Sequence, residues 1–475
     1  MVIEMSKEKE LAKNTAIILF GKICTQFVSL FLVPIYTMTL STNDYGYIDL
    51  VQTYISLLAP IIILRMDSSV FRFLVDCRNK DEEKSQIISS SFFVVVFQLV
   101  FFLLIFIIIT LFFDIKYAIF IFTTIITVSV SNVLLQITRG NGRMTDYSIA
   151  SIIAGLSTAL LNILFIFVLK KSSMFILISS TIGNTLCIIY IFIREKLYRN
   201  IKIKNIKKKR LSEMIKYSIP MIPDGLSWWI VNASDRTLIT CFLGSSFNGI
   251  YAISCKFTNI IAAFFSIFNL SWQESASVHV NDSDSKSFFA GIFDTSFKLF
   301  SSICLLVLIF TPIVYILMIG KDYIESYLYV PVLLIGSLFN AMAIVVGGAY
   351  IAKKQTKKVA RTTIASAIIN IVVNVLLIKK IGLWAAAIST TVAYLFLFVY
   401  RYIDIKEEAG FRINKKDFII VSIMFIVSII VHYINNIVLC IVNIIIMCVF
   451  CCLFNKDIIS KFISSIKKRR KNKTK

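Results

Sequence analysis

The sequence has very few of the residues with which enzymes carry out acid–base or metal chemistry. It contains two histidines, His279 and His432, and no motif links either one to an acidic partner. It has no glycine-rich loop of the kind that holds nucleotide phosphates. Its long apolar runs predict a chain that crosses a membrane, and no loop expected on the outer side is long enough to carry the catalytic apparatus of a glycan polymerase or ligase. We therefore expect a protein that is not an enzyme and needs no cofactor, with any energy coming from an ion gradient or from consumption of its product.

The ten cysteines predict neither disulfides nor a metal centre. Nine lie within long apolar runs, and Cys77 lies in a loop expected to face the cytoplasm, where thiols stay reduced. Cys448 and Cys451 have C-x-x-C spacing, but no histidine or aspartate accompanies them as a metal ligand. We interpret the cysteines as small apolar residues and predict no metal.

Charged residues are also scarce, at 16% of the chain, whereas 57% of the residues are hydrophobic and the mean hydropathy is +0.82. A soluble protein of this composition would expose an almost wholly apolar surface, so we predict an all-α integral membrane protein. A helix needs about 20 apolar residues to cross a bilayer. Runs of about this length occur at 13–39, 47–70, 87–112, 117–138, 146–169, 173–193, 213–242, 248–270, 289–318, 326–350, 359–378, 382–403, 417–434 and 436–454, about fourteen in all. The first run is long and no cleavage site follows it, so we expect a genuine span.

The distribution of Lys and Arg predicts the orientation of these spans. The loops on one side contain only Lys116, Lys170, Lys171, Lys321, Lys379 and Lys380, although the chain has 50 basic residues. The positive-inside rule therefore predicts that both termini lie in the cytoplasm. The net charge of +23 need not indicate nucleic acid, since the basic residues are spread over short loops and two runs, 202–210 and 467–475. We expect those runs to face anionic lipid headgroups.

Three short patterns occur twice in the same order. LSTNDYG at 40–46 is echoed by LGSSFNG at 243–249, and the Ile-Ala-Ser and Ile-Ser-(Ser/Thr)-Thr patterns at 149–151 and 178–181 return at 364–366 and 388–391. The simplest interpretation is a duplicated block of six helices, although chance similarity between apolar segments is an alternative. An even number of spans per copy predicts a pseudo-twofold axis along the membrane normal. We thus predict an N-terminal bundle with a basic connector (1–210), a C-terminal bundle (211–404), and two peripheral helices with a basic tail (405–475).

Several patterns near the ends of the first helices of each half are similar to a known family. They are Leu40-Ser41, Asp44-Tyr45-Gly46, Arg65, Val70-Phe71-Arg72-Phe73, Tyr217-Ser218-Ile219-Pro220 with Pro223, Asn232-Ala233-Ser234-Asp235-Arg236, Leu243-Gly244 and Gly249-Ile250-Tyr251. With these patterns the chain resembles the Wzx-type flippases of O-antigen and capsule synthesis, within the multidrug, oligosaccharidyl-lipid and polysaccharide exporter superfamily. The resemblance covers most of residues 10–403 and rests on loose patterns.

The resemblance implies a flippase that moves undecaprenyl-diphosphate-linked oligosaccharide repeat units from the inner to the outer leaflet of the bacterial cytoplasmic (inner) membrane. Its implied partners are that lipid-linked glycan, membrane lipids and the polysaccharide polymerase machinery. A diphosphate and sugars cannot cross hydrocarbon unaided, so the protein must provide a polar, cationic path by alternating access. The alternatives are a multidrug or cation exporter, a peptidoglycan-precursor flippase of the same superfamily, and a membrane-embedded glycan polymerase.

The seventh apolar run contains the clearest candidate binding residues. Trp228, Asn232, Asp235 and Arg236 follow helical spacing and form one stripe. Lys256 enters to a similar depth from the next span. We expect Arg236 to bind the diphosphate through its planar guanidinium, with Lys256 assisting. Between turnovers, Asp235 would hold one of these two cations. Trp228 is the candidate to stack on a sugar ring. A structural ion pair that joins the seventh and eighth spans is the alternative.

Two further groups of charged residues lie nearer the expected cytoplasmic side. Lys22, about a third of the way into the first span, is a candidate to meet the arriving diphosphate, and snorkelling toward the surface is its alternative role. Arg65, Asp67 and Arg72 near the end of the second span are candidates for the entrance. For these three, interfacial anchoring is the alternative.

Proline is rare, with six residues in the chain, and three of them suggest where helices bend. Pro34 lies in the first span and Pro220 and Pro223 lie in the seventh, so the first helix of each half contains proline. Proline removes a helix hydrogen bond and kinks the axis. We therefore predict hinges at these positions.

The positions of the acidic residues favour the flippase interpretation over the drug exporter. An exporter is expected to use a compact acidic ion site within one half, whereas the N-terminal half has only Asp49, Asp67 and Asp146 in its spans, all near span ends. The deep charges are largely basic, which favours an anionic cargo. Asp294 and Lys298, four residues apart, are expected to form an ordinary pair on one helix surface.

Overall fold

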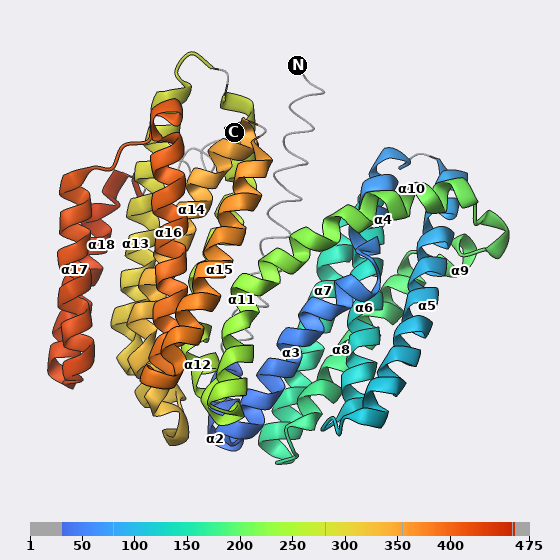
Figure 1. Ribbon diagram of the computed structural model, residues 1–475, viewed down its shortest axis with the longest axis horizontal. Coiled ribbons are helices and arrows are strands. Elements are labelled where there is room, and N and C mark those ends of the chain that lie inside the picture. The colour runs from blue at the N-terminus through green and yellow to red at the C-terminus, as the bar shows by residue number, and fades with distance from the viewer. Residues whose placement is uncertain (1–30, 79, 281, 354, 458, 461–475) are drawn as a thin grey trace, which may run out of the picture. The chain divides into compact units, whose positions relative to one another are not determined.

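The computed structural model describes residues 31–460 apart from 79, 281, 354 and 458, so Lys22 and most of the predicted first span lie outside it. The described residues form helices and connecting segments without a strand (Figure 1). The chain divides into two compact units, Met1–Thr237 and Leu238–Lys475. The all-helical fold predicted from composition is confirmed, whereas the functional division at residues 210 and 404 stays a prediction.

The N-terminal unit contains the helices of the first predicted bundle. In chain order they are α2 (Val33–Thr39), α3 (Thr42–Ile62), α4 (Met66–Asp76), α5 (Asp81–Phe112), α6 (Ala118–Gly140), α7 (Met144–Asn162) with its π-helical extension η1 (Ile163–Val168), and α8 (Met174–Arg194). The basic connector follows as α9 (Leu197–Asn200), η2 (Ile203–Asn205), α10 (Lys208–Ser218) and η3 (Ile219–Met221). Helix α11 (Ile222–Phe242) begins in this unit and ends in the next.

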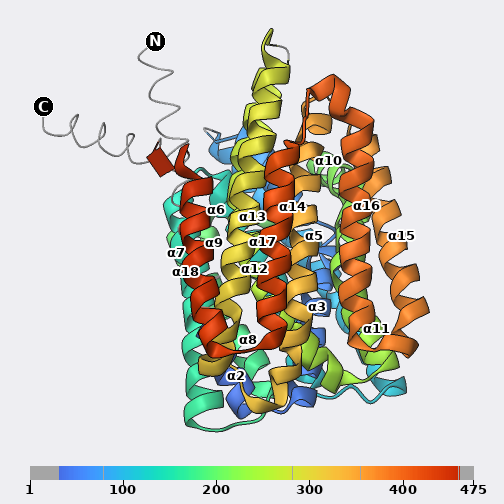
Figure 2. The same cartoon turned by 90° about the vertical axis from the view of Figure 1, so that its left-hand side faces the viewer.

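The C-terminal unit is built from long helices. They are α12 (Ser245–His279), α13 (Ser285–Met318), η4 (Lys321–Tyr329), α14 (Val330–Ala352), α15 (Thr356–Ile381), α16 (Leu383–Ala409), α17 (Lys415–Ile434) and α18 (Ile437–Phe454). Helices α17 and α18 pack on α13, at the edge of this unit, as the red ribbons in Figure 2 show. Their position agrees with the peripheral placement predicted for the last two spans.

Eleven of the described helices are long and apolar enough to cross a membrane, or twelve if α3 and α4 form one bent span. The predicted count of fourteen is therefore not confirmed. The described helices differ in how much of their surface they bury. Only 11% of the most apolar window of α5 is buried, against 67% for the helix that combines η4 and α14. Helix α5 thus presents its apolar residues outward, as a lipid-facing helix does, and α14 forms the centre of the C-terminal unit.

Within each unit the helices pair in the same order. In the N-terminal unit α3 and α4 pack on α6, and α6 and α7 pack on α8. In the C-terminal unit α12 packs on α14, and α14 and α15 pack on α16. Counted within each block of six, the second span therefore contacts the fourth, and the sixth span contacts the fourth and the fifth. This correspondence supports the duplicated block that the sequence predicts.

The first sequence echo falls at the same junction in both copies. Ser41 caps α3, with its hydroxyl accepting a hydrogen bond from the Asp44 amide at 3.1 Å. Gly244 precedes α12 with φ = 102°, a backbone conformation that glycine adopts without steric cost. Each copy therefore uses a local cap to begin its second helix directly after its first.

The second predicted span is broken where the sequence predicted a continuous helix. Helix α3 ends at Ile62, Leu64 and Arg65 adopt left-handed backbone angles with φ of 52° and 55°, and α4 restarts at Met66 with a bend of 51°. The Arg65 amide donates to the carbonyl of Pro60 at 2.8 Å, which closes the end of α3. Side chains of α4, α6 and α8 bury the bend in an apolar cluster, so packing compensates the backbone strain.

Candidate functional site

The main site in the N-terminal unit is an ion pair between α3 and α11. The Nε of Arg236 donates to an Asp49 carboxylate oxygen at 2.7 Å, a short charge-assisted hydrogen bond. The two side chains are only 17% and 10% exposed. A guanidinium that is largely removed from water keeps its charge because a carboxylate compensates it. Arg236, the residue that the sequence predicts as the diphosphate ligand, is therefore already bound to an anion in this structure.

Sequence reasoning missed Asp49 because it placed the start of the second span at residue 47. The cap at Ser41 begins α3 at Thr42, so Asp49 lies two helical turns inside the helix and not at its end. The signal was present in the sequence as a serine three residues before Asp44, the pattern of a helix N-terminus. Asp49 itself is buried.

A second polar contact joins the same two helices. The hydroxyl groups of Tyr54 and Thr237 lie 3.0 Å apart, one helical turn beyond the ion pair on α3. The Thr53 hydroxyl donates to the backbone carbonyl of Asp49 at 2.8 Å. Together with the ion pair, these groups make a polar seam between α3 and α11, consisting of Asp49, Thr53, Tyr54, Arg236 and Thr237. Polar groups of this kind between membrane helices are typical of substrate paths and of helix association.

The other predicted ligands are distributed over both units. Asp235 lies beside Arg236 on α11 and is buried, at 4% exposure. Lys256 lies on α12 in the C-terminal unit and is half-buried. Trp228 and Asn232 belong to the backbone of α11, and their side chains lie outside the described part of the chain. The predicted common level of Asp235, Arg236 and Lys256 stays a prediction.

The predicted entrance residues lie at and after the bend of the second span. Arg65 is the left-handed residue before α4, and its guanidinium lies 3.8 Å from the Asp67 carboxylate and donates to the Ser68 hydroxyl at 3.0 Å. Arg72 pairs with Asp76 at 2.6 Å on an exposed face of α4. Arg65 and Asp67 therefore form one group, and Arg72 belongs to a separate surface pair.

The three predicted hinge prolines lie at helix beginnings or breaks. Pro34 is in the first turn of α2, where its missing N–H costs no helix hydrogen bond. Pro220 lies in η3, the 3₁₀ turn between α10 and α11, and Pro223 lies in the first turn of α11. The predicted seventh span is thus interrupted at Pro220, where a change in direction requires the fewest broken hydrogen bonds.

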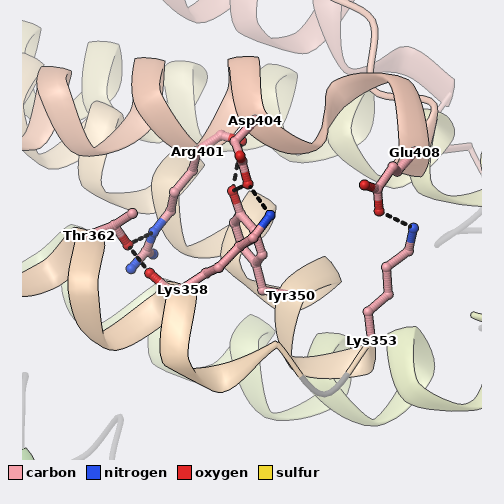
Figure 3. Close-up of polar contacts among 7 residues, drawn as sticks. All are labelled: Tyr350, Lys353, Lys358, Thr362, Arg401, Asp404 and Glu408. Atoms are coloured by element: carbon pink, nitrogen blue, oxygen red, sulfur yellow. Dashed lines mark hydrogen bonds and ion pairs between the residues drawn. The ribbon is translucent and has the colours of Figure 1, made fainter.

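A buried arginine in the C-terminal unit was not singled out from the sequence. Arg401 on α16 is 3% exposed, and its guanidinium donates to the Thr362 and Thr363 hydroxyls and to the carbonyls of Ala343 and Val359 at 2.9 to 3.2 Å. Figure 3 shows the bond to Thr362. Among the described residues no carboxylate forms an ion pair with it. Its donors bond instead to α14 and α15, so Arg401 joins three helices.

The charged residues around Arg401 are paired with one another. The Asp404 carboxylate accepts from the Tyr350 hydroxyl at 2.8 Å and from the Lys358 ammonium at 2.9 Å, and Lys353 pairs with Glu408 at 3.0 Å (Figure 3). These pairs again connect α14, α15 and α16. We assign the cluster to helix packing, since its polar groups satisfy each other. Within residues 31–460 as described, no group of three or more His, Cys, Asp or Glu residues could hold a metal ion.

Comparison with known proteins agrees with this architecture. The sequence profile of the polysaccharide biosynthesis protein family matches residues 11–272, more than half of the chain. No curated protein sequence gives a significant match.

Solved structures with the same fold include two kinds of transporter. The lipid II flippase MurJ in its inward closed conformation matches with a TM-score of 0.70 and 15% identity over 93% of this chain and 99% of MurJ. An inward-facing multidrug resistance MATE family transporter of the MOP superfamily matches with a TM-score of 0.68 and 12% identity over 82% of this chain and 98% of its own. An outward-facing multidrug resistance MATE family transporter matches with a TM-score of 0.61 and 12% identity, over 85% of this chain and 96% of its own. The chain therefore belongs to the polysaccharide biosynthesis protein family and has the fold of the MOP superfamily transporters.

Proposed function

We propose that this protein is a Wzx-type flippase that moves undecaprenyl-diphosphate-linked oligosaccharide repeat units across the bacterial cytoplasmic membrane for O-antigen or capsule synthesis. Membership of the polysaccharide biosynthesis family and a fold shared with a lipid flippase support a lipid-linked glycan as cargo. The proposal includes cytoplasmic termini and delivery of the cargo to a polymerase on the outer side. The basic loops on one side of the membrane support this orientation.

The observation that carries the proposal is the Asp49–Arg236 pair. A transporter for a diphosphate needs a cation that is stable without cargo and available when cargo arrives. Asp49 holds Arg236 at 2.7 Å in a setting where both side chains are largely buried, so the unpaired cation would be costly. A diphosphate offers the same oxygen geometry with more negative charge, and a guanidinium binds such oxygens in pairs. We infer that cargo displaces Asp49 from Arg236, with Lys256 as a second ligand.

The two units provide the alternating access. The first helix of the C-terminal repeat begins after the break at Pro220, and the second span of the N-terminal unit bends by 51° next to Arg65. Discontinuous helices with a site near them are the usual construction of secondary transporters. We propose that Arg65 and Asp67 admit the diphosphate at the cytoplasmic side and that motion at Pro220 and Pro223 transfers it outward.

Transport by the full-length protein in liposomes tests the proposal. A fluorescent undecaprenyl-diphosphate trisaccharide is placed in both leaflets, and a membrane-impermeant quencher then reports the fraction that reaches the outer leaflet. The proposal predicts that the protein accelerates exchange between leaflets, and that an undecaprenyl monophosphate without sugar is moved more slowly. Protein-free liposomes and liposomes with the Arg236→Gln variant serve as controls.

Two outcomes would replace the proposed cargo. Faster movement of lipid II than of the trisaccharide lipid would assign the protein to peptidoglycan-precursor flipping. Uptake of a cationic dye against a proton or sodium gradient, without lipid movement, would assign it to drug export.

A further inference from the structure

A basic pocket lies at the end of the C-terminal unit where α16 turns into α17. It measures about 600 Å³ and is lined by Lys286, Ser287, Ala290, Lys406, Glu407, Gly410, Phe411 and Arg412. Three of these residues are cationic and one is anionic. Within the described part of the chain, Lys286, Lys406 and Arg412 have no carboxylate partner. The pocket therefore has an uncompensated positive charge and fits an anion.

An apolar groove of about 230 Å³ begins at the same arginine. It runs between α13, α14, α16 and α17, and Arg412 lines both it and the basic pocket. Most of its lining is aromatic or aliphatic, for example Phe297, Phe339 and Phe425. Besides Arg412, its polar residues are Asp294, Asn414 and Ser422. The polar pocket thus continues into a hydrocarbon-like groove.

The walls of this joint site are held in place by the fold. Gly410 has φ = 77°, and a Cβ there would lie 2.7 Å from the Cβ of Lys286, so the turn after α16 rests directly on the start of α13. The Phe411 ring is buried against Phe293, with ring centroids 5.3 Å apart. These contacts preform the site.

The acid in the groove shares a lysine with a second acid. Lys298 pairs with Asp294 at 3.1 Å, as the four-residue spacing predicted, and also with Asp417 on α17 at 3.0 Å. The ammonium of Lys298 therefore offsets part of the negative charge of Asp294 and Asp417, and the three cations of the pocket outweigh the charge that remains. The same lysine ties α17 to α13 along one wall of the groove.

We propose that this site binds an anionic glycerophospholipid of the surrounding membrane, with its phosphate between Lys286, Lys406 and Arg412 and an acyl chain in the groove. Charge complementarity selects an anionic headgroup, and the apolar groove selects a lipid over a soluble phosphate. The site lies where three membrane helices end, on the side that the basic loops assign to the cytoplasm, and that leaflet is rich in anionic lipid. The bound lipid fills the space between the peripheral helix α17 and the bundle of the C-terminal unit.

Native mass spectrometry of the full-length protein in detergent, with phosphatidylglycerol added stepwise, tests the proposal. The double variant Lys406→Gln/Arg412→Gln removes two charges from the site. The matched control Lys415→Gln/Lys416→Gln removes two charges from the first turn of α17, outside the site. We expect the first variant to bind phosphatidylglycerol about tenfold more weakly and the control to stay within about twofold of the native protein.

A second variant tests the groove without changing charge. Ser422 lines the groove, and its hydroxyl donates to the Phe418 carbonyl of its own helix, so Ser422→Phe fills the space that an acyl chain would occupy. This variant should also lose about tenfold in affinity, since several buried methylenes are displaced.

Four results would overturn the proposal. They are equal binding of phosphatidylcholine, equal loss of affinity in the charge control, equally tight binding of glycerol phosphate alone, and displacement of phosphatidylglycerol by a lower concentration of undecaprenyl phosphate. The third would make the pocket a site for soluble anions, and the fourth would assign it to the cargo's carrier lipid.

Discussion

Gly347 on α14 lies against the guanidinium of Arg401 on α16. A Cβ added to Gly347 would lie 3.0 Å from Nη1 of Arg401, and this guanidinium is held by hydrogen bonds to two hydroxyls and two carbonyls. A side chain at that position would therefore crowd the guanidinium, and glycine leaves room for it.

Gly347→Ala is expected to destabilise the protein, although alanine normally favours a helix. The methyl group would push a restrained guanidinium out of place, at a cost of about 1 to 2 kcal/mol. Gly291→Ala on α13 is the matched control, because a Cβ there meets no atom within 4 Å. That change should stabilise by about 0.5 to 1 kcal/mol. Thermal unfolding in detergent measures both, and equal effects would contradict the assigned contact.

The left-handed backbone at Arg65 predicts an order between two variants that remove the same side chain. Arg65→Ala and Arg65→Gly both lose the contacts to Asp67 and Ser68. Only alanine retains the steric cost of φ = 55°. The glycine variant should therefore be more stable than the alanine variant by about 1 kcal/mol. If alanine is as stable as glycine, the break in the second span does not have this geometry.

Glu195 predicts how stability changes with pH. It lies just beyond α8, is 8% exposed, and accepts from the Asn141 amide at 2.9 Å. Burial raises the pKa of Glu195 above its ordinary value of 4.5. At neutral pH the folded state therefore contains a buried carboxylate, and this cost disappears as pH falls through the raised pKa. Glu195→Gln should unfold at a higher temperature than the native protein at pH 7.

The difference in melting temperature between Glu195→Gln and the native protein should shrink as the pH falls toward 4.5, because a growing share of the native carboxyl is then protonated in the folded state. Melting curves of the native protein and of Glu195→Gln, recorded at the same series of pH values from 7 to 4.5, measure this difference. A difference that stays constant over this range would show that Glu195 does not titrate with a raised pKa.

The prolines of the seventh span predict an effect on rate. Replacing Pro220 and Pro223 by alanine restores helix hydrogen bonding across the 3₁₀ break and stiffens the axis. The liposome assay should show slower flipping, by about tenfold, while membrane insertion is unchanged. If this double variant flips lipid at the native rate, bending at Pro220 and Pro223 is not part of the mechanism.

Composition and the length of the apolar runs predicted the class of fold, because a helix that crosses a bilayer needs about 20 apolar residues and such runs are visible in the sequence. The repeat was also readable, since the echo at Ser41 and Gly244 marks a cap that each copy needs. The break at Leu64 was not readable, because it depends on tertiary packing that holds two ordinary residues in left-handed conformations.

Among the site residues, the sequence identified Arg236 and missed its partner Asp49. A charged residue in an apolar run is visible in any sequence, but its partner is 187 residues away and on another helix. Arg401 was missed for a related reason. Its acceptors are threonine hydroxyls and backbone carbonyls, and these carry no signal in a sequence.

The most direct test of the account is the double variant Asp49→Asn/Arg236→Gln in the liposome assay. Asparagine and glutamine replace the ion pair by a neutral hydrogen-bonded pair, so neither partner is left as a buried charge and the protein should fold. If Arg236 binds the diphosphate, this variant melts within a few degrees of the native protein and moves the trisaccharide lipid at least about a hundredfold more slowly. If it is equally stable and flips at the native rate, the pair is structural and the proposed binding site is wrong.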